Sequence, residues 1–264
     1  GRTGAGRGRG AVTTATGRPD LPAAVERPLR ARAAAAVAAW GAALLVASVL
    51  DRAAYEALSV TDDHSRRMLE SADWYRVLRV MGSMWLWGPV AAVFMMVDRA
   101  RIREGARMSG GWTRRGVMLL TCALLSGGAA ELLKALVGRL RPENSGGWYA
   151  FMSLGERLEW NWSDLGMPSS HAAVAFGAAM ALSFTHRAAA PLLFLGAAGC
   201  GLTRVVMEQH YLSDVVAGAA VAYAVSLAVW RVDARNNGGV GLGVPAAGAR
   251  TEGRPRPARG SAAP

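Results

Sequence analysis

The chain has little cysteine and no internal repeat. Two cysteines occur among 264 residues, and both, Cys122 and Cys200, fall inside apolar stretches. This pattern gives no support for a disulfide framework or a thiolate metal site, so we expect both residues to be small packing residues. The absence of a repeat with a fixed period argues against solenoid and propeller architectures.

Charge is nearly absent from six apolar runs, at approximately 33–50, 80–97, 116–137, 172–184, 191–203 and 215–232. A helix needs about 20 apolar residues to cross ~30 Å of hydrocarbon. The first, second, third and sixth runs approach this length, and the other two adjoin polar motifs that can extend the helix. The first run lacks a clear cleavage site and begins too far from the N-terminus for a simple signal peptide. We predict an all-α fold with six transmembrane helices; a soluble all-α protein with buried helices is the alternative.

The net charge of +11 is unevenly distributed. Arginine predominates in three segments, 1–30, 98–115 and 231–264. Acidic and basic residues balance in two others, 51–79 and 138–170. This alternation follows the positive-inside rule for membrane proteins. It predicts cytoplasmic termini and an outward-facing side that also includes the turn at 204–214. Basic residues interleaved with stacking aromatics are absent, so we expect no nucleic-acid partner.

The composition divides the chain into three parts. Residues 1–30 and 236–264 are rich in glycine, proline and arginine and show no hydrophobic period, which is typical of disordered tails. Residues 31–235 are expected to form one membrane domain, with membrane lipids around it. Within this domain, the loop 143–167 carries five aromatic residues. They fit ordinary interfacial anchoring or part of a lip through which a lipid enters a site.

A first polar motif follows the third apolar run. Lys134 and Arg141 are seven residues apart, so they lie on one helical face if the helix persists. Pro142 disfavours helix at Arg141, which predicts that the helix ends there. Lys134 could alternatively snorkel to the interface or form an ion pair with Glu131.

A second motif, Pro168-Ser169-Ser170-His171, opens the fourth run. Serine is a preferred N-cap, and the free N–H groups of a first helical turn bind anions. The motif therefore predicts a helix start that could hold a phosphate. A capped helix with an incidental histidine is the alternative.

A third motif places Arg204, His210 and Asp214 around the start of the sixth run. If 210–214 is helical, the histidine and the carboxylate lie on one face within hydrogen-bonding reach. A carboxylate that holds one imidazole nitrogen leaves the other as a nucleophile. A structural ion pair is the alternative. Zinc binding is disfavoured because three cations would crowd the same site.

Together the three motifs resemble the PAP2 superfamily, whose signature is Lys-x6-Arg-Pro, Pro-Ser-Gly-His and Ser-Arg-x5-His-x3-Asp. The order and the internal spacings agree over 116–232. Two residues depart from the signature: Ser170 replaces glycine and Thr203 replaces serine. The resemblance implies a helical PAP2/haloperoxidase-like core with a phosphate site.

The resemblance also implies roles for individual residues. His210 would attack phosphorus, Asp214 would orient it, and His171 would protonate the leaving alkoxide. The phosphate-binding residues would be Lys134, Arg141, Ser169, Ser170 and Arg204. No metal or other cofactor is expected, because phosphoryl transfer depends mainly on positioning and charge stabilisation.

The expected activity is hydrolysis of a lipid phosphate or pyrophosphate through a phosphohistidine at the extracytoplasmic face of the cell membrane. A lipid-linked phosphotransferase with the same site is one alternative. A vanadium haloperoxidase and a catalytically silent membrane scaffold or transporter are others. The sequence does not select the lipid.

Overall fold

The computed structural model describes residues 23–104, 114–158 and 162–236, with side chains from residue 31 onward. Within these ranges the regular secondary structure is helical, and the only strand-like pairings are two isolated β-bridges, Arg139 with Phe151 and Leu140 with Leu165. The all-α prediction is therefore confirmed. Most of the two predicted disordered tails, 1–22 and 237–264, lies outside the described residues, as does Trp160 of the aromatic loop.

Five of the six apolar runs each lie within one helix, whereas the run 80–97 spans the break between α3 and α4. The described α-helices are α1 (Ala23–Leu58), α2 (Asp63–Ser71), α3 (Asp73–Val80), α4 (Met84–Arg103), α5 (Arg114–Val137), α6 (Pro142–Ser145), α7 (Leu154–Leu158), α8 (Ser170–Thr185), α9 (Ala190–Val206) and α10 (Leu212–Asn236). Among them, α1, α5, α9 with the preceding turn, and α10 are long and apolar enough to cross a membrane.

The predicted count of six spans is not confirmed. The described helices give four spans, or five if α3 and α4, which meet at a 67° bend, count as one. The apolar helix α8 has 16 residues, fewer than the ~20 that a typical span requires. The chain is nevertheless a multi-pass membrane protein.

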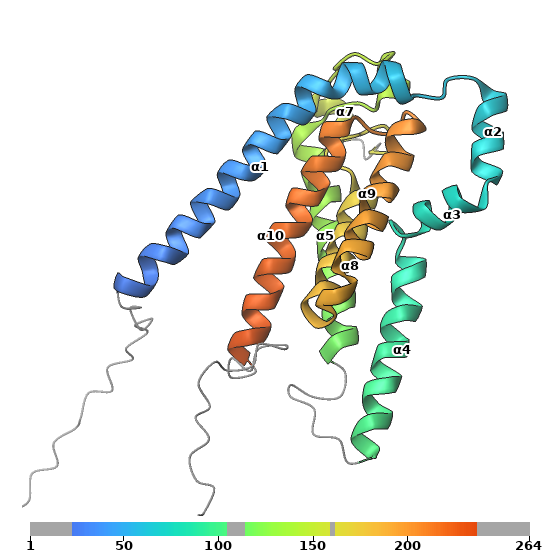
Figure 1. Ribbon diagram of the computed structural model, residues 1–264. Coiled ribbons are helices and arrows are strands. Elements are labelled where there is room, and N and C mark those ends of the chain that lie inside the picture. The colour runs from blue at the N-terminus through green and yellow to red at the C-terminus, as the bar shows by residue number, and fades with distance from the viewer. Residues whose placement is uncertain (1–22, 105–113, 159–161, 237–264) are drawn as a thin grey trace, which may run out of the picture. The chain divides into compact units, whose positions relative to one another are not determined.

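Helix α8 lies at the centre of the helical packing. It contacts α5, α9 and α10, and these four helices run side by side (Figure 1). Six alanines on α8 are buried: Ala172, Ala173, Ala175, Ala178, Ala179 and Ala181. Small side chains allow helices to approach closely in membrane proteins. Cys122 and Cys200 are free cysteines, each buried in a different hydrophobic cluster, as expected of packing residues.

The chain divides into two compact units, residues 1–42 and 43–264. The described part of the first unit is the start of α1. The second unit contains the rest of α1 and all other helices, and every residue discussed below belongs to it.

Three predicted boundaries were wrong. Helix α1 begins at Ala23, inside the predicted tail, and the predicted loop 51–79 contains the end of α1 together with α2 and α3. Helix α5 ends at Val137 rather than near Arg141, because Gly138 adopts a left-handed conformation with φ of 70°. Its N–H donates to the Lys134 carbonyl at 2.8 Å, which is a common way for helices to end.

Candidate active site

Lys134 lies in the last turn of α5, and its side chain is only 4% exposed. Nζ donates to Glu131 Oε1 at 2.9 Å and to Ser170 Oγ at 3.2 Å. A snorkelling lysine would extend its ammonium toward water, whereas this ammonium is buried between α5 and α8. The ion pair with Glu131, which was the alternative interpretation of Lys134, is present, and the contact with Ser170 joins the first motif to the second.

The second motif opens α8, as predicted. Ser169 is the N-cap, and its hydroxyl accepts from the Ala172 N–H at 3.4 Å. The Ser169 N–H itself donates to the Asp214 carbonyl at 3.0 Å, so this helix start is tied to α10. His171 lies in the first turn of α8, packed so tightly against Gly82 that a Cβ there would lie 2.8 Å from the His171 Cβ.

The third motif is built on the turn between α9 and α10. Arg204 is buried in the last turn of α9, and its carbonyl accepts from the N–H groups of Gln209 at 3.0 Å and His210 at 3.2 Å. Glu208 occupies a left-handed conformation with φ of 56°, which is uncommon for a residue other than glycine. Its carboxylate pairs with Arg66 of α2, so a separate helix supports the turn that carries the histidine.

His210 and Asp214 face one another, but not from one helix. Nδ1 of His210 lies 3.5 Å from Oδ2 of Asp214, which is a polar contact too long for a good hydrogen bond. The assumption that 210–214 is helical was wrong, because α10 begins at Leu212. The same Oδ2 accepts from the Tyr211 N–H at 2.9 Å, a capping bond that fixes the carboxylate beside the histidine.

Two arginines from different motifs converge on one oxygen atom. Oε1 of Gln209 accepts from Arg141 Nη1 at 2.7 Å and from Arg204 Nη2 at 3.2 Å. The Nε atoms of both arginines are buried and have no hydrogen-bond partner within the part of the chain that the structure describes. Two permanent cations, brought from segments far apart in the sequence, thus point their donors at a common place beside His210.

The electrostatic surroundings keep His210 neutral at neutral pH. Burial is the main cause that lowers the pKa of His210 to about 4. The contact with Asp214 opposes this shift, while the charges of Arg204 and Lys134 add to it. His171 lies within electrostatic range of the same two cations and of His210. The structure therefore gathers members of all three motifs around one buried volume.

Sequence reasoning missed Arg139, Ser213 and Asp51. The Arg139 guanidinium pairs with the buried Asp214 carboxylate and donates to Ser213 Oγ at 2.8 Å. Asp51, on α1, accepts from the Ser213 N–H at 2.8 Å and also bonds the Ser213 hydroxyl and, at 2.6 Å, the Tyr149 hydroxyl. Spacing gives no signal for these contacts, because they join three segments that are distant in the sequence.

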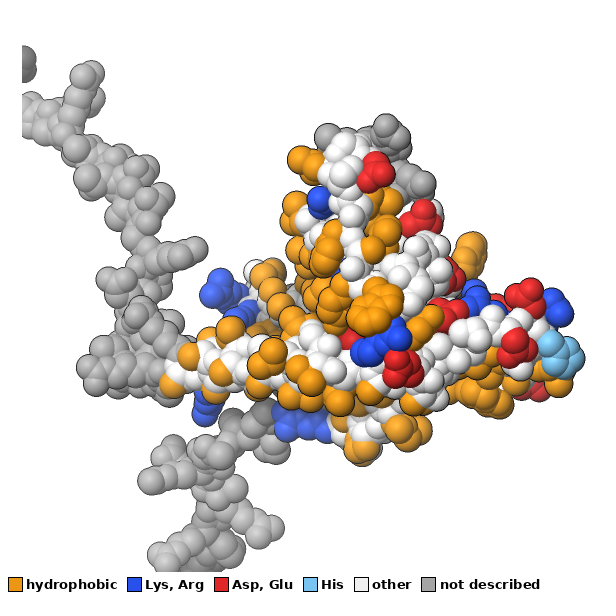
Figure 2. All heavy atoms as spheres, turned by 90° about the horizontal axis from the view of Figure 1, so that it is seen from above, with side chains coloured by type: hydrophobic (Ala, Val, Ile, Leu, Met, Phe, Trp, Pro, Cys, Tyr) orange, Lys and Arg blue, Asp and Glu red, His pale blue; other side chains and the backbone are white. Residues whose placement is uncertain are grey.

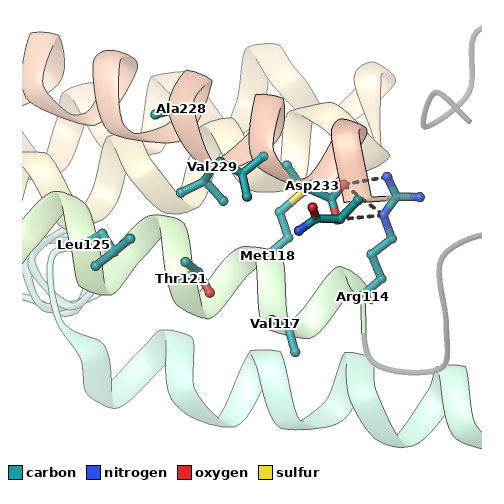
Figure 3. A pocket seen from close by; sticks show the side chains of 10 residues that line it. Arg114, Val117, Met118, Thr121, Leu125, Ala228, Val229 and Asp233 are labelled. Atoms are coloured by element: carbon teal, nitrogen blue, oxygen red, sulfur yellow. Dashed lines mark hydrogen bonds and ion pairs between the residues drawn. The ribbon is translucent and has the colours of Figure 1, made fainter. Parts of the chain in front are cut away.

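A trough of three adjoining cavities follows α5 and reaches this site. The first cavity, of about 550 Å³, lies between α5 and α10, where the Arg114–Asp233 ion pair closes one end (Figure 3). The second, of about 610 Å³, shares Leu125, Ala228 and Val229 with the first. The third, of about 350 Å³, shares Leu124, Gly128 and Glu131 with the second and is also lined by Ser170 and His171. Between the Arg114–Asp233 pair and the polar residues of the site, the lining of the trough is mostly apolar.

The motifs themselves lie beneath the surface at one end of the helices. Acidic and basic side chains lie next to one another on that end, among apolar ones (Figure 2). Asp214, His210 and Ser169 are each less than 3% exposed. Among the described residues, no group of three or more His, Cys, Asp or Glu side chains is arranged to hold a metal ion.

Comparisons with known proteins identify relatives for the second half of the chain. The model of the PAP2 superfamily matches residues 115–237. A lipid A 1-phosphatase of Rhizobium etli is 36% identical over 110 residues, which are 40% of this chain and 44% of that protein. A lipid A 1-phosphatase of Rhizobium johnstonii is 35% identical over 125 residues, which are 46% of this chain and 48% of that protein. The alignments thus span about half the length of these relatives. No solved structure gives a significant match.

Proposed function

Because residues 115–237 match the model of the PAP2 superfamily, we propose that this chain is a membrane phosphatase of that superfamily that hydrolyses a lipid phosphate through a phosphohistidine on His210. The likeness to two lipid A 1-phosphatases supports a lipid substrate. The residues that would act are those of the three motifs, and they lie together at one end of the helices.

The convergence of Arg141 and Arg204 on one oxygen of Gln209 is the observation that carries the proposal. Guanidinium groups bind phosphate oxygens through charge-assisted hydrogen bonds. A phosphoryl oxygen in place of the glutamine oxygen would receive donors from both arginines. Lys134 and the free N–H groups at the start of α8 would contact the other oxygens.

His210 is the proposed nucleophile. Its Nδ1 faces Asp214, which leaves Nε2 to attack phosphorus. A nucleophilic nitrogen must carry a free lone pair, and the pKa of about 4 keeps the imidazole unprotonated at neutral pH. As the Nε2–P bond forms, positive charge develops on the ring, and the Asp214 carboxylate stabilises it.

His171 is the proposed general acid and base. Burial and the nearby cations lower the pKa of His171 to about 3, so it would first take up a proton as the negatively charged phosphate binds, and would then donate that proton to the lipid alkoxide as the P–O bond breaks. In the second half of the reaction it would take a proton from water as the water oxygen attacks phosphorus and releases His210. The products are inorganic phosphate and the lipid alcohol. All of this chemistry uses side chains of the protein.

The orientation in the membrane is part of the proposal. The ends of α5, α8, α9 and α10 that carry the motifs lie at the same end of the helices (Figure 1). The distribution of arginines in the sequence places this end outside the cytoplasm. We therefore propose an extracytoplasmic active site in the cell membrane.

The test is phosphate release from lipid phosphates by the detergent-purified full chain and by His210→Ala, with EDTA present throughout. The expected result is EDTA-resistant release that falls by about a thousandfold or more in the variant, as for loss of a nucleophile. His186→Ala is the matched control, because His186 is exposed at the far end of α8 and should leave the rate unchanged.

Two outcomes would overturn the proposal. Release that survives in His210→Ala would remove this residue as nucleophile, and release abolished by EDTA would point to a metal-dependent reaction. Transfer of radiolabelled phosphate to an added alcohol, without release to water, would favour the phosphotransferase alternative. A base-stable, acid-labile phosphoprotein in the His171→Ala variant would provide direct support for the intermediate.

A further inference from the structure

Glu131 pairs with Lys134, one of the proposed phosphate-binding cations, and its own side chain is accessible. Its carboxylate accepts from Lys134 at 2.9 Å, and its side chain is 46% exposed, whereas that of Lys134 is 4% exposed. The pair therefore has a buried positive member and an exposed negative member. Glu131 lines the trough, whereas Lys134 does not.

Ser170 is the third member of the same contact. Its hydroxyl accepts from Lys134 at 3.2 Å and lies within hydrogen-bonding range of Glu131. The family signature has glycine at this position, which would leave the lysine and the glutamate without this partner. The departure thus adds a polar contact that helps to fix the position of Glu131.

Glu131 marks the junction between the apolar trough and the site. It lines the 610 Å³ cavity along α5 and α10 and also the 350 Å³ cavity that contains Ser170 and His171. Among the described residues that line these two cavities, it is the only Asp, Glu, Lys or Arg. A lipid chain in the trough would emerge beside this carboxylate and beside His171, which lines the same cavity and is the proposed proton donor to the leaving oxygen.

We propose that Glu131 is a specificity-determining residue that selects lipid phosphomonoesters over lipid pyrophosphates. This inference rests on the proposed function. In a monoester, the leaving oxygen and the uncharged or hydroxyl-bearing part of the lipid lie beside Glu131. In a pyrophosphate, a second phosphate takes that position, and its negative charge is repelled by the carboxylate.

A second glutamate provides an internal comparison. The carboxylate of Glu143 lies 3.5 Å from Arg141, so it too is paired with a proposed phosphate-binding cation. It is exposed and lines neither cavity of the trough that reaches the site. If position along the trough decides selectivity, removing the charge of Glu143 should not have the same effect.

The experiment compares farnesyl monophosphate with farnesyl pyrophosphate, which share one hydrocarbon chain, as substrates of the full chain in detergent micelles. The quantity measured is the ratio of kcat/KM for the pyrophosphate to kcat/KM for the monophosphate. Loss of the Glu131 ion pair disturbs Lys134 and so affects the hydrolysis of both substrates. The ratio of the two kcat/KM values therefore isolates the effect of the second phosphate. We expect Glu131→Gln to raise this ratio by about tenfold, from a charge interaction across several ångströms of partly hydrated protein.

Glu131→Asp, which keeps the charge, should leave the ratio within about twofold of the wild-type value, as should Glu143→Gln. An unchanged ratio in Glu131→Gln would overturn the inference and leave Glu131 as an ion-pair partner only. An equal rise in Glu143→Gln would also overturn it, since it would indicate a general effect of net charge. Absence of phosphate release from both substrates by the wild-type protein would instead contradict the proposed function.

Discussion

Asp214 is held by two donors and faces the imidazole of His210. Arg139 pairs with Oδ1, while Oδ2 accepts from the Tyr211 N–H at 2.9 Å and faces His210 at 3.5 Å. The carboxylate is fully buried, and the Arg139 side chain is 5% exposed. At a fixed orientation, such a carboxylate can stabilise charge on the imidazole without having to reorganise.

Substituting Arg139 should therefore reduce both stability and catalysis. We expect Arg139→Gln to lower the free energy of unfolding by about 3–5 kcal/mol, because it leaves a buried carboxylate without its cation. We expect kcat to fall by about a hundredfold, because Asp214 is then free to turn away from His210. Thermal unfolding in detergent and phosphate release measure the two effects.

A double-mutant cycle separates positioning from a general structural role. If Arg139 acts through Asp214, Arg139→Gln should have little further effect on kcat in an Asp214→Asn background, since contacting residues are not additive. Additive losses would contradict that role. Arg67→Gln, on an exposed position of α2, is the control for removal of an arginine and should leave both quantities unchanged.

Lys134 is the only lysine in the chain, among 30 basic residues. The ammonium is a compact charge with three donors, whereas a guanidinium is planar and broad. The space between Glu131 and Ser170 accommodates the smaller group. Every other residue in the Lys and Arg count of this chain is an arginine.

At the scale of the element, sequence signals located the helices better than their ends. The serine N-cap at Ser169 predicted the start of α8, because capping depends on local chemistry. The end of α5 was misplaced because Gly138, and not Pro142, stops the helix. Arg157 then donates to the carbonyls of Ala135 and Leu136 at 2.9 Å each, a contact from outside the helix.

The motif residues of the candidate site could be predicted, but their supporting contacts could not. The spacing within the three motifs identified the motif residues, among them Lys134, His171 and Arg204. Gln209 and Asp51 are ordinary polar residues whose partners come from distant segments, as in the Asp51–Ser213 contact across 162 positions. Such contacts depend on how helices meet, which hydrophobic periodicity does not determine.

The crossing of α8 and α10 depends on one glycine. A Cβ on Gly218 would lie 2.5 Å from the Ser169 carbonyl oxygen, so Gly218→Ala must push the helices apart. We expect it to lower the free energy of unfolding by about 1–3 kcal/mol, as for overpacked cores. Because Ser169 also bonds the Asp214 carbonyl, phosphate release should fall by about tenfold.

Gly88→Ala is the matched control, since a Cβ there meets nothing within 4 Å. Alanine is the better helix former, so this variant should be unchanged or more stable by up to about 1 kcal/mol. Thermal unfolding measures the stability of both variants. Equal destabilisation by the two substitutions would contradict the role of the close crossing at Gly218.

At the scale of the whole molecule, the two ends of the helices should face different compartments. Asn144 on α6 and Glu104 after α4 are both exposed, and the two native cysteines are buried. We expect a cysteine at position 144 to react with a membrane-impermeant maleimide in intact cells, and one at position 104 to react only after permeabilisation. The reverse pattern would place the proposed active site in the cytoplasm.

Asp51 limits how this protein can be divided. It lies outside the matched segment 115–237, yet its carboxylate holds the first turn of α10 at Ser213. Arg66, which supports the Glu208 turn, lies outside that segment as well. The matched segment is therefore not a module that can be transferred by itself: a chimaera that grafts only 115–237 onto foreign N-terminal helices would contain the motifs without the residues that hold them in place.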